Sequence, residues 1–216
     1  MIGQLFAPEQ DVFVEDRLRP HWSQAGAIVF ITFRTKDSIP KKVLGQWEED
    51  KIAWLEARGL LGRHKHWSTV LPALSDKDHQ GFQTQFNRTR EAFLDTCQGK
   101  CLLKQPETAE IVAKALSYFD AERYRLGDFI IMPNHVHLLA AFPTPEQMRA
   151  QCASWLRFSA REINKQTGEQ GHFWQQEPFD HLVRSASQYD YLRQYIADNP
   201  TKAGLRPGDF YHHETS

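Results

Sequence analysis

The pattern of apolar and polar positions predicts helices and strands in mixed order. Strands are expected at 27–35, 118–126 and 128–142, with a turn at 126–128 and further strand-like stretches within 172–185. Apolar residues at helical spacing predict helices over 41–58, 78–94, 106–119, 146–166 and 187–199. This order favours an α+β fold, an antiparallel sheet with helices packed on one face, and the ferredoxin-like arrangement is our first choice.

Two histidines stand inside the most apolar of these stretches. The segment from Phe129 to Phe142 is apolar on both faces, as a central strand is, and it contains His135 and His137. Alternate side chains of a strand share a face, so the two imidazoles project together and can supply half of the inner shell of a divalent metal. Taken alone, such a pair more often marks histidines that form hydrogen bonds at a sheet surface.

The last predicted helix carries a second pair of polar residues. Tyr195 and Asn199 are four residues apart and share a helix face. Pro200 disfavours helical geometry at the residue before it, so the helix is expected to end at Asn199. By itself this pair also fits a packing tyrosine and a capping asparagine. Tyr191 lies one turn earlier, but Tyr195 alone has the four-residue spacing to Asn199.

Composition limits the function classes. The 216 residues are 41% hydrophobic and 25% charged, which is ordinary for a globular protein. We expect an arm at 1–20, one domain at 21–206 and a tail at 207–216. No apolar run approaches the ~18 residues of a membrane span, and the start lacks a signal-like pattern, so a cytoplasmic protein without membrane contact is expected. The net charge of −1 argues against non-specific coating of nucleic acid, so DNA binding would need local basic patches.

The motifs acquire meaning in combination. His135-Val136-His137 followed by Tyr195-x-x-x-Asn199-Pro200 resembles the HUH single-tyrosine transposases, and more specifically the REP-associated tyrosine transposases of bacterial chromosomes. The resemblance covers most of residues 19–206 in the same order. It includes the segments 30–34, 119–125, 132–139, 154–164, 173–184 and 195–205.

The resemblance implies an HUH endonuclease fold and a metal-dependent, sequence-specific single-stranded DNA endonuclease and strand transferase. Family members bind Mg²⁺ or Mn²⁺, and the matching ligands here are His135, His137 and Asn199. Tyr195 would be the nucleophile and form a 5′-phosphotyrosine intermediate. Related mobile-element groups carry Gln at the position of Asn199. The resemblance therefore supports the histidines as ligands more strongly than it supports Asn199.

The substrate that the resemblance implies is single-stranded DNA beside a hairpin or palindromic repeat. Candidate DNA contacts are a basic row on one helix, an aromatic side chain for base stacking and three cations near the predicted site. These are Arg157, Arg161 and Lys165; Trp174; and Arg34, Arg184 and Lys202. The basic row equally fits a solvated helix face.

Two other functions remain open from the sequence. One is a non-catalytic DNA hairpin-binding protein or regulator on the same fold, and the other is a metallohydrolase that uses water as its nucleophile. The resemblance favours a monomer, because the REP-associated kind tend to be monomers, whereas mobile-element relatives often act as dimers. A second His-x-His, at His64 and His66, lies in a basic segment without apolar alternation and is expected at the surface.

Overall fold

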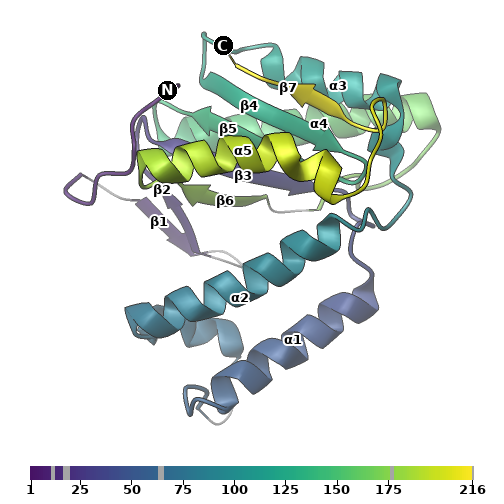
Figure 1. Ribbon diagram of the computed structural model, residues 1–216. Coiled ribbons are helices and arrows are strands. Elements are labelled where there is room, and N and C mark those ends of the chain that lie inside the picture. Colours follow the sequence, from purple (N-terminus) through teal and green to yellow (C-terminus); the bar gives the residue numbers. More distant parts are fainter. Residues whose placement is uncertain (11–12, 17–19, 63–65, 176–177, 216) are drawn as a thin grey trace.

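A five-stranded antiparallel sheet forms the centre of the computed structural model, which describes residues 1–10, 13–16, 20–62, 66–175 and 178–215. The strands lie in the order β6-β3-β5-β4-β7, and every pairing between neighbours is antiparallel (Figure 1). They are β3 (Ile28–Arg34), β4 (Arg125–Met132), β5 (His135–Ala141), β6 (Phe179–Leu182) and β7 (Tyr211–His213). The predicted α+β class with an antiparallel sheet is confirmed.

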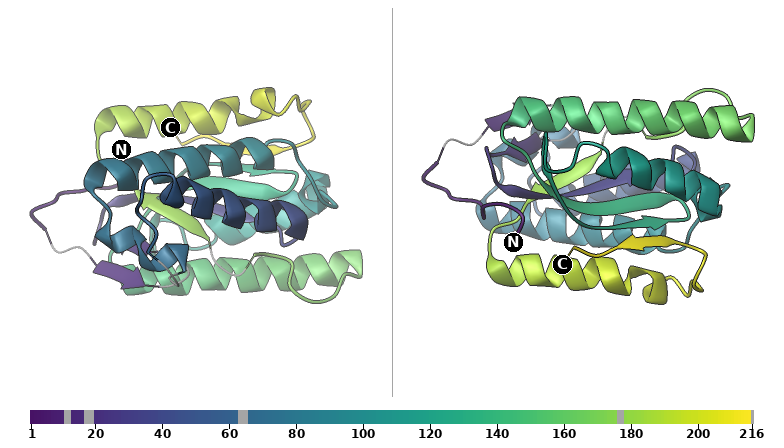
Figure 2. Two further views of the ribbon diagram at one scale, coloured as in Figure 1. Left: turned by 90° about the horizontal axis from the view of Figure 1, so that it is seen from below. Right: turned by 90° about the horizontal axis from the view of Figure 1, so that it is seen from above.

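The ferredoxin-like arrangement is also present. With the helices α3 (Pro106–Ser117) and α4 (Pro145–Thr167), the chain order β3-α3-β4-β5-α4-β6 is a βαββαβ unit. Both helices cover one face of the sheet, as predicted. The helix α5 (Ala186–Lys202) covers the opposite face, so the expectation of helices on one face alone was wrong (Figure 2). The central strands are apolar on both faces, and each face must therefore be covered.

Each face has its own hydrophobic core. On the side of α4, the predicted helical stripe is buried against the sheet; it consists of Met148, Cys152, Trp155, Ser159 and Ile163. On the side of α5, Leu192 and Ile196 pack on Phe30 and Leu139 of the strands. Phe30 and Ile31 are both within 1% of full burial although they face opposite sides, which shows that β3 is an inner strand.

Two helices between β3 and α3 form a separate packing unit. They are α1 (Lys41–Glu56) and α2 (Asp76–Leu94), as predicted, joined through the short helical turns η1 (Trp67–Thr69) and η2 (Leu71–Ala73). Their small core contains Trp54, Leu55, Trp67 and Phe82 and is distinct from the two cores of the sheet. We call residues 41–94 the helical insertion; Figure 1 shows it extending away from the sheet.

The predicted turn at 126–128 was wrong. Gly127 lies within β4, at a shift of register between Leu126 and Phe129, and the chain reverses at Pro133 and Asn134 instead. The predicted strand from 128 to 142 is therefore two strands. The pattern did not reveal this turn because apolar residues flank it on both sides, so the hydrophobic run continues through it.

The predicted end of the last helix at Asn199 was also wrong. The helix α5 continues to Lys202 with Pro200 inside it. Proline removes a single backbone donor, and the Ala203 N–H still bonds the carbonyl of Asn199 at 3.1 Å. Gly204, with a φ of +66°, then ends the helix. Asn199 consequently lies on a regular helical turn, on the same face as Tyr195.

The remaining segments are short. The chain before β3 contains β1 (Phe13–Asp16) paired with β2 (Pro20–Ser23), which extends past the predicted end of the arm at residue 20. The turn η3 (Leu102–Lys104) precedes α3, and β7, within the predicted tail, joins the sheet beside β4. The predicted surface pair at His64 and His66 falls partly outside the described residues, because His64 is not among them. In the part of the chain that is described, no helix has the length and apolar character to cross a membrane.

Candidate metal and nucleophile site

The two histidines of β5 project toward α5, as the period of the strand predicts. Both are fully buried, and the centroids of their rings lie 4.6 Å apart. Their partners across the ladder on β3 are Arg34 for His135 and Thr32 for His137. Residues opposite each other in a ladder share a face, so both partners belong to the surroundings of the site.

One nitrogen of each imidazole already has a protein partner. His137 Nδ1 lies 2.8 Å from the Thr32 hydroxyl, and His135 Nδ1 lies 2.7 Å from Asn134 Oδ1. Both Nε2 atoms are buried and have no hydrogen-bond partner in the described part of the chain. Histidines that bind metals through one nitrogen and are oriented through the other show this arrangement.

The surroundings keep both imidazoles neutral. Burial, followed by the neighbouring His137, holds the pKa of His135 well below its ordinary value. Burial also lowers the pKa of His137 to about 3, with further contributions from Arg90 and His181. Neutral imidazole is the form that binds a metal, so the pair is ready to act as ligands at neutral pH.

Helix α5 brings the second pair of residues to the first. The ring of Tyr195 lies 5.3 Å from that of His137, centroid to centroid, and Asn199 one turn later is fully buried. The hydroxyl of Tyr195 and both polar atoms of the Asn199 amide make no well-formed hydrogen bond among the residues described, although Glu91 and Asn199 lie close enough to the phenol to shift its pKa. The structure thus brings together all four residues that the sequence singled out.

So many unsatisfied buried polar atoms in one place call for a ligand. Each costs about 1–3 kcal/mol if nothing binds it. Two imidazole nitrogens and an amide oxygen are suitable ligands for a divalent metal ion. His135, His137 and Asn199 supply these atoms, and they are the three ligands that the resemblance implied. No cluster of three or more His, Cys, Asp or Glu suited to a metal occurs in the described ranges, so this mixed set is the candidate.

One comparison with known proteins covers the segment that contains this site. Residues 98–199 match the family model described as "Transposase IS200 like", a segment that includes both histidines and Tyr195 and ends at Asn199. The match spans 102 of the 216 residues, slightly less than half of the chain, so it is a resemblance of this segment to the family. A solved structure described as a REP-associated tyrosine transposase bound to a REP hairpin is similar over 94% of each chain, with 13% identity and a TM-score of 0.44. No curated protein matches the chain.

The helical insertion, which lies outside the IS200-like segment, contributes residues that the sequence did not indicate. Arg90, near the C-terminal end of α2, is 5% exposed and influences both His137 and His181. Burial, with the nearby carboxylates of Glu91 and Asp95, raises the pKa of Tyr195. These three residues belong to no motif, and their approach depends on the tertiary position of α2, so spacing along the chain gave no signal for them.

The carboxyl group of Asp95, directly after the end of α2, is itself affected by this position. Burial and the neighbouring Glu91 raise the pKa of Asp95 to about 6, and Lys202 acts in the opposite direction. Charged residues at the C-terminal end of α2 and directly after it therefore lie on this side of the site. Both histidines and Asn199 are fully buried, so the site is closed to solvent in this structure.

The predicted DNA contacts are distributed unevenly around the site. The ammonium of Lys202 lies 4.9 Å from the centre of the Tyr195 ring, and Arg34 is the ladder partner of His135, so both lie at the site. Arg184 is exposed just before the start of α5, at the end of the helix away from Tyr195.

The basic row of α4 does not join this group. Arg157, Arg161 and Lys165 are exposed, but α4 covers the face of the sheet opposite to the histidines. The stacking role predicted for Trp174 was wrong. Its ring is 6% exposed in the core, and its indole N–H donates to the Ser159 hydroxyl at 2.9 Å. An aromatic residue after a polar stretch gave no sign of this burial.

Proposed function

We propose that the protein is a metal-dependent single-stranded DNA endonuclease and strand transferase that acts at hairpins or palindromic repeats, with Tyr195 as its nucleophile. The observation that supports this proposal is that the ring of Tyr195 lies 5.3 Å from that of His137, beside His135 and Asn199, and that each of the four side chains has a buried polar atom without a hydrogen bond among the residues described. The family of residues 98–199 supports a transposase-like role.

The residues have distinct tasks in this proposal. His135, His137 and Asn199 would hold Mg²⁺ or Mn²⁺, which when bound offsets the negative charge that builds up on the scissile phosphate. The Tyr195 oxygen would attack the phosphorus and lose its proton. The bond to the 3′-oxygen would break, and that oxygen would gain a proton. The product is a 5′-phosphotyrosine and a free 3′-hydroxyl, and attack by another 3′-hydroxyl reverses the step and joins strands.

The burial of the site implies that it must open before DNA can reach the ligands and the nucleophile. The pKa of Tyr195 is raised by burial, by Glu91 of α2 and by Asp95 directly after it, so the phenol holds its proton in this structure. A DNA strand also needs access to fully buried ligands. We propose that α2 moves aside when DNA binds, which removes two carboxylates from the nucleophile and admits the phosphate.

Two basic side chains near Tyr195 are the candidates for contacts to the DNA strand. Lys202 and Arg34 are the cations placed to contact phosphates beside Tyr195. We further propose that the protein acts as a monomer in the bacterial cytoplasm, on chromosomal repeats. Sedimentation at micromolar concentration tests the monomer, and a dimer mass would contradict it.

A doubly labelled substrate tests the proposed activity. A DNA hairpin with a single-stranded flank, labelled at both ends, is incubated with Mn²⁺ and analysed on a denaturing gel. The proposal predicts a released 5′-labelled fragment and a 3′ label that migrates with the protein. Tyr195→Phe should abolish both products. Tyr191→Phe is the matched control, because this exposed tyrosine lies one turn away on α5 and its variant should remain active.

The other candidate functions give different results in this assay. A non-catalytic hairpin-binding protein would retard the DNA but release no fragment with either tyrosine. A hydrolase with a water nucleophile would release the fragment without a protein-bound label, and Tyr195→Phe would still cut. Either pattern would refute the proposed function.

A further inference from the structure

The residue before the histidine pair has a defined orientation. Asn134 is fully buried, and its Nδ2 donates to the backbone carbonyl of Gln98 at 2.9 Å. A carbonyl only accepts hydrogen bonds, so this contact settles which end of the amide faces Gln98. The other end, Oδ1, lies 2.7 Å from His135 Nδ1. An amide oxygen also only accepts, so the imidazole hydrogen of this bond must be on Nδ1.

The position of that hydrogen determines what the other nitrogen can do. A neutral imidazole carries one ring hydrogen, and with it on Nδ1 the Nε2 atom presents a lone pair. We propose that Asn134 is a positioning residue that holds His135 in the Nδ1–H tautomer, so that Nε2 is available to a divalent metal ion; as a statement about metal binding, this rests on the proposed function. Consistent with this role, Nε2 of His135 is buried and has no hydrogen-bond partner in the described chain.

The second histidine is held in a less selective way. The partner of His137 Nδ1 is the hydroxyl of Thr32 at 2.8 Å. A hydroxyl can donate or accept, so this bond orients the ring without selecting its tautomer. Selection of the tautomer is therefore specific to Asn134 and His135.

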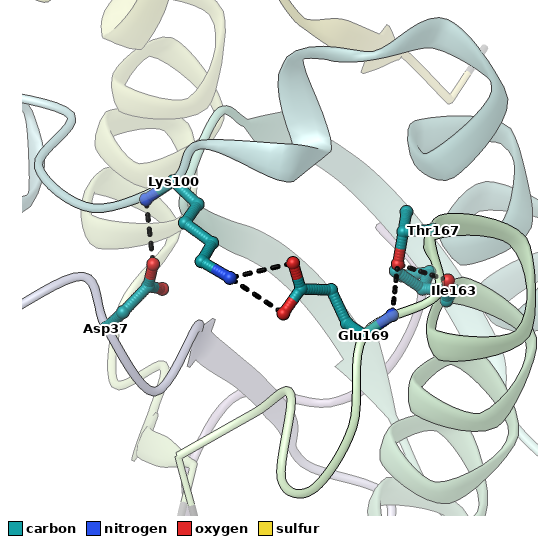
Figure 3. A network of polar contacts seen from close by, with 5 residues as sticks. All are labelled: Asp37, Lys100, Ile163, Thr167 and Glu169. Carbon is teal, nitrogen blue, oxygen red and sulfur yellow. Dashed lines mark hydrogen bonds and ion pairs between the residues drawn. The ribbon is translucent and has the colours of Figure 1, made fainter.

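The carbonyl that orients Asn134 belongs to an anchored loop. The backbone N–H of Lys100 donates to Asp37 at 2.7 Å, and its ammonium contacts both carboxylate oxygens of Glu169 at 2.7 Å (Figure 3). Thr167 accepts from the Glu169 N–H at 3.4 Å and continues the network to α4. The loop around Gln98 is thus attached both to the segment after β3 and to the end of α4.

Gly99 lets this loop approach Asp37 closely. Its φ is +97°, and a Cβ there would lie 2.9 Å from the backbone oxygen of Asp37. The substitution Gly99→Ala would therefore displace the Gln98 carbonyl without altering Asn134 or His135. If the orientation of Asn134 depends on this carbonyl, the variant should weaken the selection of the tautomer.

The first test measures the tautomer directly in the metal-free wild-type protein. Long-range ¹H–¹⁵N NMR of protein with ¹⁵N-labelled histidine distinguishes the two neutral forms, and the His135 signals are assigned by their loss in His135→Gln. We expect the Nδ1–H form for His135. The Nε2–H form in the wild-type protein would overturn the inference. The measurement requires neither metal nor DNA.

The second test measures metal binding. Titration with Mn²⁺, followed by electron paramagnetic resonance of the free ion, gives the dissociation constant of each variant. Asn134→Ala should bind Mn²⁺ about 10–100-fold more weakly and shift His135 toward the other tautomer, with Gly99→Ala between it and the wild type. Asn164→Ala is the matched control, because this side chain also donates to a backbone carbonyl at 2.9 Å, at the end of α4.

The outcomes separate this inference from the proposed function. Equal Mn²⁺ affinity in Asn134→Ala and Asn164→Ala, with an unchanged His135 tautomer, would overturn the inference. The expected tautomer in a wild-type protein that binds no Mn²⁺ would support the positioning role of Asn134 and refute the metal-dependent function.

Discussion

Acidification should destabilise the folded protein through its buried histidines. The pKa of His137 is about 3 in the folded protein, against about 6.5 for an unperturbed histidine in the unfolded chain. The unfolded chain therefore binds more protons between these values, and stability is lost as the pH falls from about 6.5 toward 3. The contribution is fully present above pH 6.5.

The size of the effect follows from the same values. A histidine that titrates in the unfolded chain alone costs about 1.4 kcal/mol of unfolding free energy per pH unit, which gives about 2 kcal/mol for His137 between pH 7 and pH 5. The lowered pKa values of His135 and His181 add losses of the same sign. Asp95, with a pKa of about 6, acts in the opposite direction because a raised carboxyl pKa favours the folded state on acidification.

Urea unfolding followed by circular dichroism, at pH 7 and pH 5 with a chelator present, measures this loss. Comparison with the double variant His135→Gln/His137→Gln removes the background from Asp95 and other groups. The wild type should lose at least about 2 kcal/mol more than the double variant. His212→Gln, at an exposed histidine, should behave as the wild type does. Equal losses in the wild type and the double variant would refute the argument that the pair is buried in the neutral form.

Three further predictions concern single side chains. Thr32→Val should weaken Mn²⁺ binding about 10-fold in a titration, because it removes the hydroxyl that orients His137. Thr35→Val is the control and should leave the affinity unchanged, because the Thr35 hydroxyl is buried without a hydrogen bond among the described residues. Equal affinities in the two variants would contradict the orienting role of Thr32. Arg193→Met removes the charged partner of the buried Asp128 carboxylate, 2.6 Å away, and leaves only the Thr215 N–H donating to it among the described residues. The unfolding free energy in urea should fall by about 2 kcal/mol, and a fall below about 0.5 kcal/mol would show that the pair does not hold α5 to β4. Lys202→Ala should lower the slope of the logarithm of the hairpin-binding constant against the logarithm of the salt concentration by about one, the value of one phosphate contact. Fluorescence anisotropy measures this slope, and an unchanged slope would place the lysine away from the DNA.

The sequence predicted those parts of the site that depend on local periodicity. The two-residue period of a strand places His135 and His137 on one face, and the helical period does the same for Tyr195 and Asn199. These rules hold within one element, so wrong element ends did not disturb them. The helix continued past Asn199 and the strand began at His135, yet each pair kept its shared face.

The other parts of the site depend on how elements pack. Arg90 reaches the histidines because α2 lies across the site, and no spacing in the sequence encodes that position. Asn134 lies in a turn hidden within an apolar run, and the role we assign to it depends on the distant carbonyl of Gln98. Trp174 shows the reverse error, since an aromatic residue assigned to DNA belongs to the core.

Mass spectrometry of the covalent product tests the central claim most directly. After reaction of the wild-type protein with a hairpin substrate and Mn²⁺, digestion with protease and nuclease should leave one peptide that carries a nucleotide on Tyr195. A nucleotide on Tyr191 or on another residue, or DNA cleavage without a modified peptide, would contradict the claim that this phenol is the nucleophile.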